Sequence, residues 1–168
     1  MTFAFDDKER LNWHFIPRQR NGLPLKDMNE DQRKLALALL ATGVSKSGYD
    51  KAATIMTLEE DVAVMAKDPV KFNPLGYHLS VFGTPGSEGV WAWRFEGHHV
   101  AFNMTIAGGT FIRGAPAFLG AIPAIVKDGP RKGLRVLGED EDMGRRLAQS
   151  LTGAQRTTHR RGQPAGRR

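Results

Sequence analysis

Apolar and polar residues alternate most strictly between residues 90 and 106, with the period of two that is typical of half-buried strands. Glu96 and Gly97 interrupt the alternation, and a glycine there supplies the positive φ angle that a two-residue hairpin turn requires. With these residues at the turn, antiparallel pairing sets Trp93 opposite Val100. The pattern then gathers the large apolar side chains on one face of the hairpin: Trp91, Trp93, Phe95, Val100 and Phe102.

The polar face of this predicted hairpin is the first candidate for a binding site. The same register pairs Arg94 with His99, and Asn103 lies four residues further along the same strand face. A nearby arginine disfavours the protonated imidazole, so we expect His99 to be mostly neutral at pH 7. His98 should point to the opposite face, so regular strand geometry does not bring both histidine rings to one metal ion.

Helical periodicity replaces the alternation on either side of the predicted sheet. A helix over residues 29–42 begins at a capping residue, Asp27 or Asn29, and a second helical region covers residues 45–66 as one helix or two. A further helix over residues 139–151 begins with acidic residues, the order that the helix dipole favours.

Strand patterns also cover residues 77–84 and 110–115, one on each side of the hairpin. The order of these elements predicts an α+β fold with N-terminal helices, a four-stranded antiparallel meander and a C-terminal helix.

Composition and charge narrow the class of protein. Cysteine is absent, which excludes disulfides and thiolate metal sites, and no apolar run is long enough to span a bilayer. The N-terminus lacks the apolar stretch of a signal peptide, so the sequence predicts a cytoplasmic protein. Residues 1–153 are expected to form a single α+β domain. Residues 154–168 carry five arginines and no acid, and we expect them to form a disordered tail that holds most of the net charge of +6.

Two further groups of residues are candidates for a site. His14 lies between Trp13 and Phe15, where it either packs as a hinge or reaches the site as a third polar group. A metal at His99 would require His14 or a carboxylate from another segment. Three cations flank an irregular loop at residues 22–25, where they either remain solvated or hold a carboxylate or phosphate: Arg18, Arg20 and Lys26.

Three sequence segments, at residues 12–28, 80–86 and 93–99, together resemble the family called domain of unknown function 3500. The resemblance runs from about Phe5 to Arg156 and implies that this chain corresponds to the N-terminal half of a longer domain. It therefore implies self-association or a complementing second half as possible partners, and it implies no activity. Seven candidate residues lie in these segments: His14, Arg18, Trp93, Arg94, Glu96, His98 and His99.

The sequence leaves three functions open. The first is a small-molecule or metal-dependent enzyme of unknown reaction, with His99, His14 and Glu96 as ligands or acid–base groups. The second is a non-catalytic module that binds an anionic ligand or a protein partner through Arg94, Asn103 and Arg18. The third is weak nucleic-acid association through residues 154–168. The identity of any metal or cofactor is open.

Overall fold

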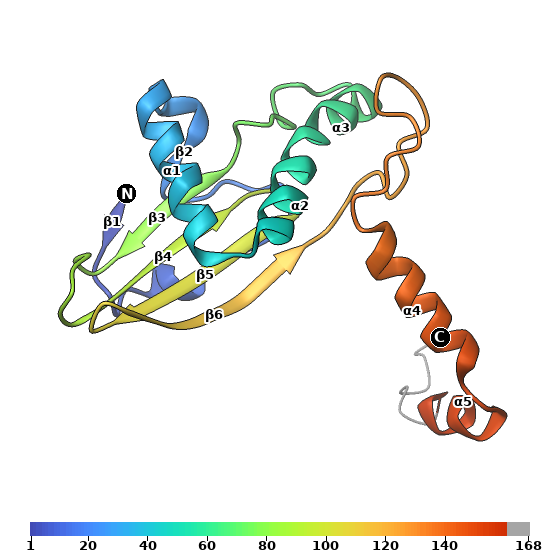
Figure 1. The fold of residues 1–168 in the computed structure, drawn as a ribbon. Coiled ribbons are helices and arrows are strands. Elements are labelled where there is room, and N and C mark those ends of the chain that lie inside the picture. Colours follow the sequence, from blue (N-terminus) through green and yellow to red (C-terminus); the bar gives the residue numbers. More distant parts are fainter. Residues whose placement is uncertain (161–168) are drawn as a thin grey trace, which may run out of the picture. The chain divides into compact units, whose positions relative to one another are not determined.

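The computed structural model describes residues 1–160, and the chain divides into a first unit over Met1–Val136 and a second unit that begins at Leu137. The first unit combines helices with a sheet, which confirms the predicted α+β class (Figure 1). Its elements, in which η denotes a short 3-10 helix, are β1 (Thr2–Phe3), η1 (Lys8–Leu11), β2 (Leu23–Pro24), η2 (Leu25–Asp27), α1 (Glu30–Gly43), α2 (Lys46–Thr57), α3 (Glu59–Ala66), β3 (His78–Phe82), β4 (Val90–Glu96), β5 (Val100–Ala107) and β6 (Thr110–Leu119).

Strands β3 to β6 pair antiparallel in chain order and form the expected meander, but the sheet has six strands. Two short N-terminal strands both pair with β3: β1 runs parallel to it and β2 runs antiparallel to it. The sheet is therefore mixed. Strands of two residues leave no periodic pattern in a sequence, so β1 and β2 were not predictable from it.

The hairpin between β4 and β5 turns at His98 and His99, not at Glu96 and Gly97 as predicted. Trp93 lies opposite Met104 rather than Val100. Gly97 pairs across the turn by donating its N–H to the Val100 carbonyl oxygen at 2.8 Å.

The positive φ angle of this turn belongs to His99, at 62°. Gly97 serves a different purpose, because a Cβ atom there would meet the Tyr77 ring at 2.3 Å. The glycine is required for close packing, and the sequence pattern could not distinguish that need from a turn. The turn lies two residues later than predicted, so the partner of Trp93 moves by four residues, from Val100 to Met104. Because four is an even number, the face that each side chain occupies is unchanged.

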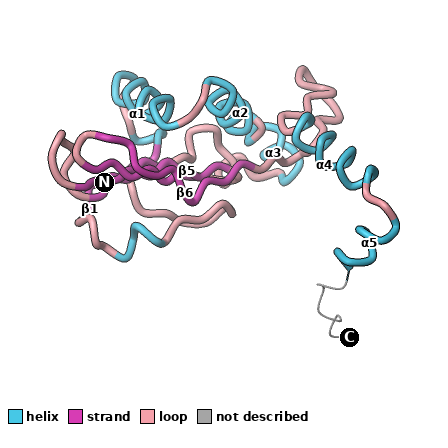
Figure 2. The backbone as a smooth tube through the Cα atoms, turned by 60° about the horizontal axis from the view of Figure 1, so that its bottom comes forward, coloured by secondary structure: helices cyan, strands magenta, loops and turns pink. Residues whose placement is uncertain are grey.

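The two faces of the sheet are covered by different parts of the chain. Figure 2 shows the sheet from its edge, with α1 and α2 on one side. On the other side lies the N-terminal segment, by which we mean the chain between β1 and β2, including η1. Of the five large side chains predicted to share the core, Trp91 is half-buried, and the other four are buried on the helical side: Trp93, Phe95, Val100 and Phe102.

The helix starts follow the expected capping in part. Asn29 caps α1 in a capping box with Gln32, in which each side chain accepts the other residue's backbone N–H at 2.9 Å. The second helical region is divided into α2 and α3 at Leu58, and no side chain caps the start of α3. Thr57, just before this junction, does not cap α3, because its hydroxyl donates to the Thr54 carbonyl oxygen at 2.8 Å.

The second unit contains α4 (Gly138–Ser150) and α5 (Gly153–Arg160). Helix α4 is the predicted C-terminal helix. Helix α5 lies where the sequence analysis expected the disordered tail of residues 154–168. Thr152 and Gln155 explain its start, because each side chain accepts the other residue's backbone N–H in a second capping box. The remainder of the predicted tail, residues 161–168, lies outside the described residues.

No helix within residues 1–160 combines the length and apolarity that a membrane span needs.

Candidate functional site

A network of four charged side chains is buried on the N-terminal side of the sheet. Arg94 in β4 is fully buried, and its Nε atom lies 2.7 Å from Oε1 of Glu96. Its terminal nitrogens bind the Glu9 carboxylate and, at 2.6 Å, the Glu9 carbonyl oxygen. The second carboxylate oxygen of Glu96 accepts the backbone N–H of His14 at 2.8 Å and lies 3.5 Å from Nε of Arg20. Two acids and two cations therefore balance one another and fasten the N-terminal segment to the sheet.

Arg20 extends this network into the hairpin turn. Its Nη2 atom donates to the carbonyl oxygens of His14 at 2.9 Å, Ile16 at 2.6 Å and Gly97 at 2.9 Å. One guanidinium therefore fixes the path of residues 14–20 against the end of β4.

The polar face predicted for the hairpin is thus occupied by this network. The expected pair of Arg94 and His99 is wrong, because the true turn places Arg94 opposite Asn103. Asn103 donates its side-chain N–H to the Pro116 carbonyl oxygen at 2.8 Å. Arg94 and Glu96 lie under the N-terminal segment with almost no solvent exposure.

His14 and Arg18 separate from the other predicted residues. The Nδ1 atom of His14 accepts the backbone N–H groups of Phe15 at 3.0 Å and Ile16 at 3.2 Å, which favours the hinge interpretation. Within residues 1–160, no hydrogen bond or ion pair joins the His99 ring to His14, Glu96 or Arg94. Arg18 is exposed, and its Nη2 atom lies 3.3 Å from Oδ1 of Asn12.

His99 lies at a junction of three segments. Its backbone N–H donates to Phe15 and its carbonyl oxygen accepts the N–H of Gly120, both at 2.8 Å. Burial, together with the charge of His98, lowers the pKa of His99 to about 4. The predicted neutral imidazole is therefore confirmed, but its cause is burial and His98 rather than Arg94. The His98 and His99 rings lie 4.1 Å apart because the two residues form a turn and not a regular strand.

We expect His99 to make the protein less stable in acid. Between pH 6.5 and pH 4 the unfolded chain protonates this histidine and the folded chain does not, so stability falls as pH falls. His99→Asn removes the titration and tolerates the positive φ angle. Between pH 7 and pH 4.5, the variant should lose about 1–2 kcal/mol less unfolding free energy than the wild type, after discounting for partial solvent exposure. Urea unfolding at both pH values measures this, and equal losses would contradict it.

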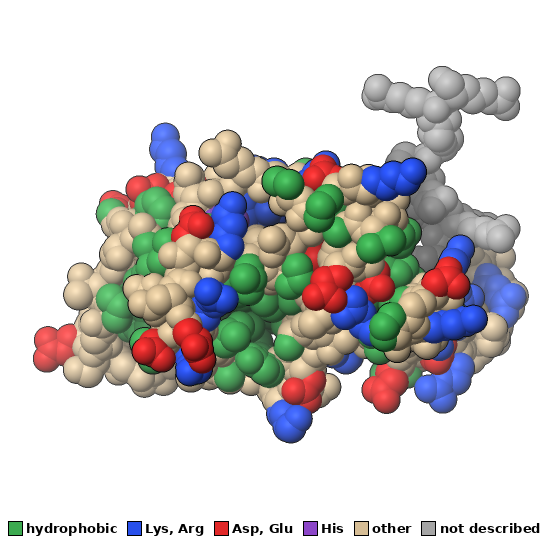
Figure 3. Space-filling view, turned by 90° about the horizontal axis from the view of Figure 1, so that it is seen from above, with side chains coloured by type: hydrophobic (Ala, Val, Ile, Leu, Met, Phe, Trp, Pro, Cys, Tyr) green, Lys and Arg blue, Asp and Glu red, His purple; other side chains and the backbone are tan. Residues whose placement is uncertain are grey.

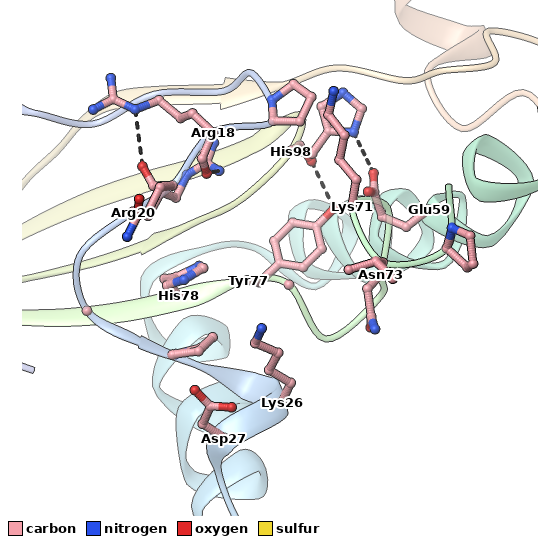
Figure 4. A pocket seen from close by; sticks show the side chains of 17 residues that line it. Arg18, Arg20, Lys26, Asp27, Glu59, Lys71, Asn73, Tyr77, His78 and His98 are labelled. Carbon is pink, nitrogen blue, oxygen red and sulfur yellow. Dashed lines mark hydrogen bonds and ion pairs between the residues drawn. The ribbon is translucent and has the colours of Figure 1, made fainter. Parts of the chain in front are cut away.

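A cavity of about 850 Å³ opens at the start of β3, away from the polar face that the sequence analysis selected. Arg18, Arg20 and Lys26, the three cations predicted to flank one loop, all line it. In Figure 4, Lys26 and Asp27 lie on one side of the cavity, and Arg18, Arg20 and His98 lie on the other. Further polar lining comes from α3, from the segment between α3 and β3, and from the first residue of β3: Glu59, Lys71, Asn73, Tyr77 and His78.

Backbone hydrogen bonds set the cavity walls. The η2 segment that carries Lys26 is fixed to the opposite wall, because the N–H of Leu25 donates to Tyr77 at 2.8 Å and that of Lys26 to Leu75 at 3.0 Å. The loop that carries Lys71 is shaped by Asp68, whose carboxylate accepts the Lys71 N–H at 3.0 Å.

The cavity contains a histidine–carboxylate pair. Nδ1 of His98 lies 2.7 Å from Oε1 of Glu59, and their side chains are 10% and 5% exposed. Glu59 lies in the first turn of α3, where the helix dipole favours a negative charge. The pair therefore joins the helical layer to the tip of the hairpin.

Tyr77 and His78 complete the base of the cavity. The buried Tyr77 hydroxyl donates to the His98 carbonyl oxygen at 2.8 Å. Burial and the negative charge of Glu59 raise the pKa of Tyr77 well above its usual value. Burial and the charge of Arg20 lower the pKa of His78, so its ring is neutral at pH 7. The Nδ1 atom of His78 is buried and has no hydrogen-bond partner among the described residues.

Most of the residues that give this cavity its chemistry carry no signal in the sequence that marks them. Glu59 lies in an acidic triplet, Glu59-Glu60-Asp61, that is typical of any exposed helix start, and no spacing marks its first member as buried. Lys71 and His78 have neighbours that carry no motif. The one usable signal was the group of cations around residues 22–25.

A family model described as Protein of unknown function (DUF3500) matches residues 1–165, so the chain belongs to this family. No match was found among curated proteins or among solved structures.

Proposed function

We propose that this member of the DUF3500 family binds an anionic small molecule, such as a carboxylate or a phosphate, in the cavity at the start of β3. One observation carries the proposal: three exposed cations from separate segments line the same cavity, and none of them forms an ion pair within residues 1–160. They are Arg18 from the N-terminal segment, Lys26 from η2 and Lys71 from the loop after α3.

The acids in the lining do not neutralise these cations in full. Glu59 is engaged by His98, and Arg20 is balanced by Glu96 below the cavity. Asp27 is the other acid among the described lining residues, so positive charge is in excess. Cationic side chains recognise carboxylate and phosphate oxygens through charge-assisted hydrogen bonds, with arginine offering two parallel donors.

The size of the cavity also suits a small molecule. Small-molecule sites commonly enclose about 300–1,000 Å³, and this cavity lies within that range. No group of three or more potential metal ligands occurs within residues 1–160, so the proposal rests on the cations.

A broad basic surface for nucleic acid receives less support. On the face shown in Figure 3, basic and acidic side chains are interspersed around apolar ones rather than forming a field of one sign. Nucleic-acid binding through a surface needs clustered cations. The arginine-rich end that suggested this function lies largely outside the described residues.

The test is a titration with sulfate, phosphate and malonate, followed by calorimetry. We expect at least one anion to bind saturably at a single site of the wild type. The triple variant Arg18→Gln, Lys26→Gln and Lys71→Gln should bind that anion about tenfold more weakly or worse, since each charged hydrogen bond contributes roughly 1.5–3 kcal/mol. The control replaces three exposed cations that do not line the cavity: Lys8→Gln, Arg113→Gln and Lys132→Gln.

Both triple variants lose the same net charge, so a nonspecific effect of charge would weaken binding equally in the two. Equal weakening, or no saturable binding of any of the three anions to the wild type, would contradict the proposal.

A further inference from the structure

We propose that His98, held by the Glu59 carboxylate, is the proton-exchanging group of this cavity and contacts the bound anion as an imidazolium. The inference rests on the proposed anion binding and deepens it, because it names the residue through which the ligand exchanges a proton. The observation behind it is the placement of a histidine–carboxylate pair in the wall of a cavity with excess positive charge.

The contact with Glu59 determines which ring nitrogen is available. At 2.7 Å from a carboxylate oxygen, Nδ1 of His98 carries the hydrogen in both the neutral and the charged ring. Nε2 is then the proton acceptor of the neutral ring, and no described group forms a hydrogen bond to it. A carboxylate that fixes the tautomer of a histidine in this way leaves the second nitrogen ready to accept or donate a proton.

The ring is held in place before any ligand arrives. The Tyr77 hydroxyl fixes the His98 carbonyl oxygen, and the Phe72 ring lies 5.6 Å from the imidazole on another side. The turn itself is fixed because Arg20 binds the carbonyl oxygen of Gly97. His98 therefore cannot turn freely toward solvent, which is the rigidity that a proton-exchanging group in a binding site needs.

The charged groups around His98 act in opposite directions. Glu59 favours the imidazolium, whereas the surrounding cations disfavour it. An anion bound in the cavity adds a negative charge near His98, so binding should favour the imidazolium. Two titratable groups lie directly against the His98 ring: Glu59 from α3 and His99 in the turn. The others line the same cavity: Arg18 and Arg20 from the N-terminal segment, Lys26 and Asp27 from η2, Lys71 from the loop after α3, Tyr77 before β3 and His78 in β3.

Binding and protonation are then coupled. One proton enters with the anion wherever the His98 ring of the free protein is neutral, and there the affinity declines by up to about tenfold per pH unit. The same Nε2 atom is positioned to exchange that proton with the ligand, as general acid–base chemistry requires.

The experiment uses sulfate, because its charge is constant between pH 5.5 and pH 8.5. Calorimetry in two buffers of different ionisation enthalpy should detect uptake of a proton, approaching one per sulfate at the basic end of this range. In His98→Asn, whose amide still donates to Glu59, sulfate should bind with little dependence on pH and without proton uptake. Glu59→Gln should move the pH dependence of the wild type to lower pH.

Ring nitrogen chemical shifts of His98 in the wild type provide a second readout that does not depend on a variant. They should show hydrogen on Nδ1 alone in the free protein at pH 8.5, and on both nitrogens in the sulfate complex near pH 6.5. Saturable sulfate binding without proton uptake would overturn this inference and leave the anion site intact. Proton uptake that survives His98→Asn would assign the proton to another group. Absence of sulfate binding at every pH would overturn both proposals.

Discussion

Arg94→Met should lower the free energy of unfolding by about 3–5 kcal/mol, the range expected when one partner of a buried ion pair is removed. Arg94 is fully buried and contacts both Glu9 and Glu96. Methionine fills much of the same volume but leaves the buried Glu96 carboxylate and the partly buried Glu9 carboxylate without the guanidinium that both contact. Urea unfolding at pH 7 measures the loss.

The matched control is Lys34→Met, which removes a cation that pairs with Glu30 at 2.8 Å on the surface of α1. Its side chain is 67% exposed, so the loss should be less than about 1 kcal/mol. If the two variants lost the same stability, the network on the N-terminal side of the sheet would not anchor residues 9–20.

Trp93→Ala should lower the free energy of unfolding by about 3–5 kcal/mol, because it opens a cavity between α1 and the sheet. The ring is 2% exposed, and it fills the space above Gly43, where even a Cβ atom would meet it at 2.7 Å. Thermal or urea unfolding measures this loss. The anion affinity should not change, since Trp93 does not line the anion-binding cavity at the start of β3.

Trp91→Ala is the control for this variant. Trp91 lies on the same face of β4 but is only half-buried. It should lose clearly less stability than Trp93→Ala. A larger loss from Trp91 would mean that the centre of the core lies nearer the open end of the hairpin.

The fold was largely predictable because the periodicity of apolar residues assigns each side chain to a face of the sheet even where the predicted strand register is wrong. Trp93 and Phe95 were assigned to the buried face correctly although the turn was placed two residues too early. The position of the turn was not predictable, since it depends on the close approach of the Tyr77 ring to Gly97, which are 20 positions apart in the chain. Long-range steric contacts of this kind leave no local pattern.

The candidate site was predictable only where its charged residues are close together in the sequence. Arg18, Arg20 and Lys26 are close in sequence, and the structure places all three on one cavity. The pair formed by Glu59 and His98 joins residues that are 39 positions apart, and only the packing of α3 against the hairpin brings them together. Arg94 was chosen for its place on a polar strand face, and Glu96 was chosen as a ligand or acid–base group at the predicted turn. That face is covered by the N-terminal segment, so their charges are satisfied inside the protein.

The central claim is that the cavity at the start of β3 binds anions, and mapping backbone amide shifts during a sulfate titration tests it most directly. We predict saturable shifts at the amides of the three walls, near Arg18, Lys26 and Lys71, and at the hairpin turn around His98. Residues of α4 in the second unit should not change. Shifts concentrated in α4, α5 or the arginine-rich end, with the cavity walls unaffected, would contradict the claim.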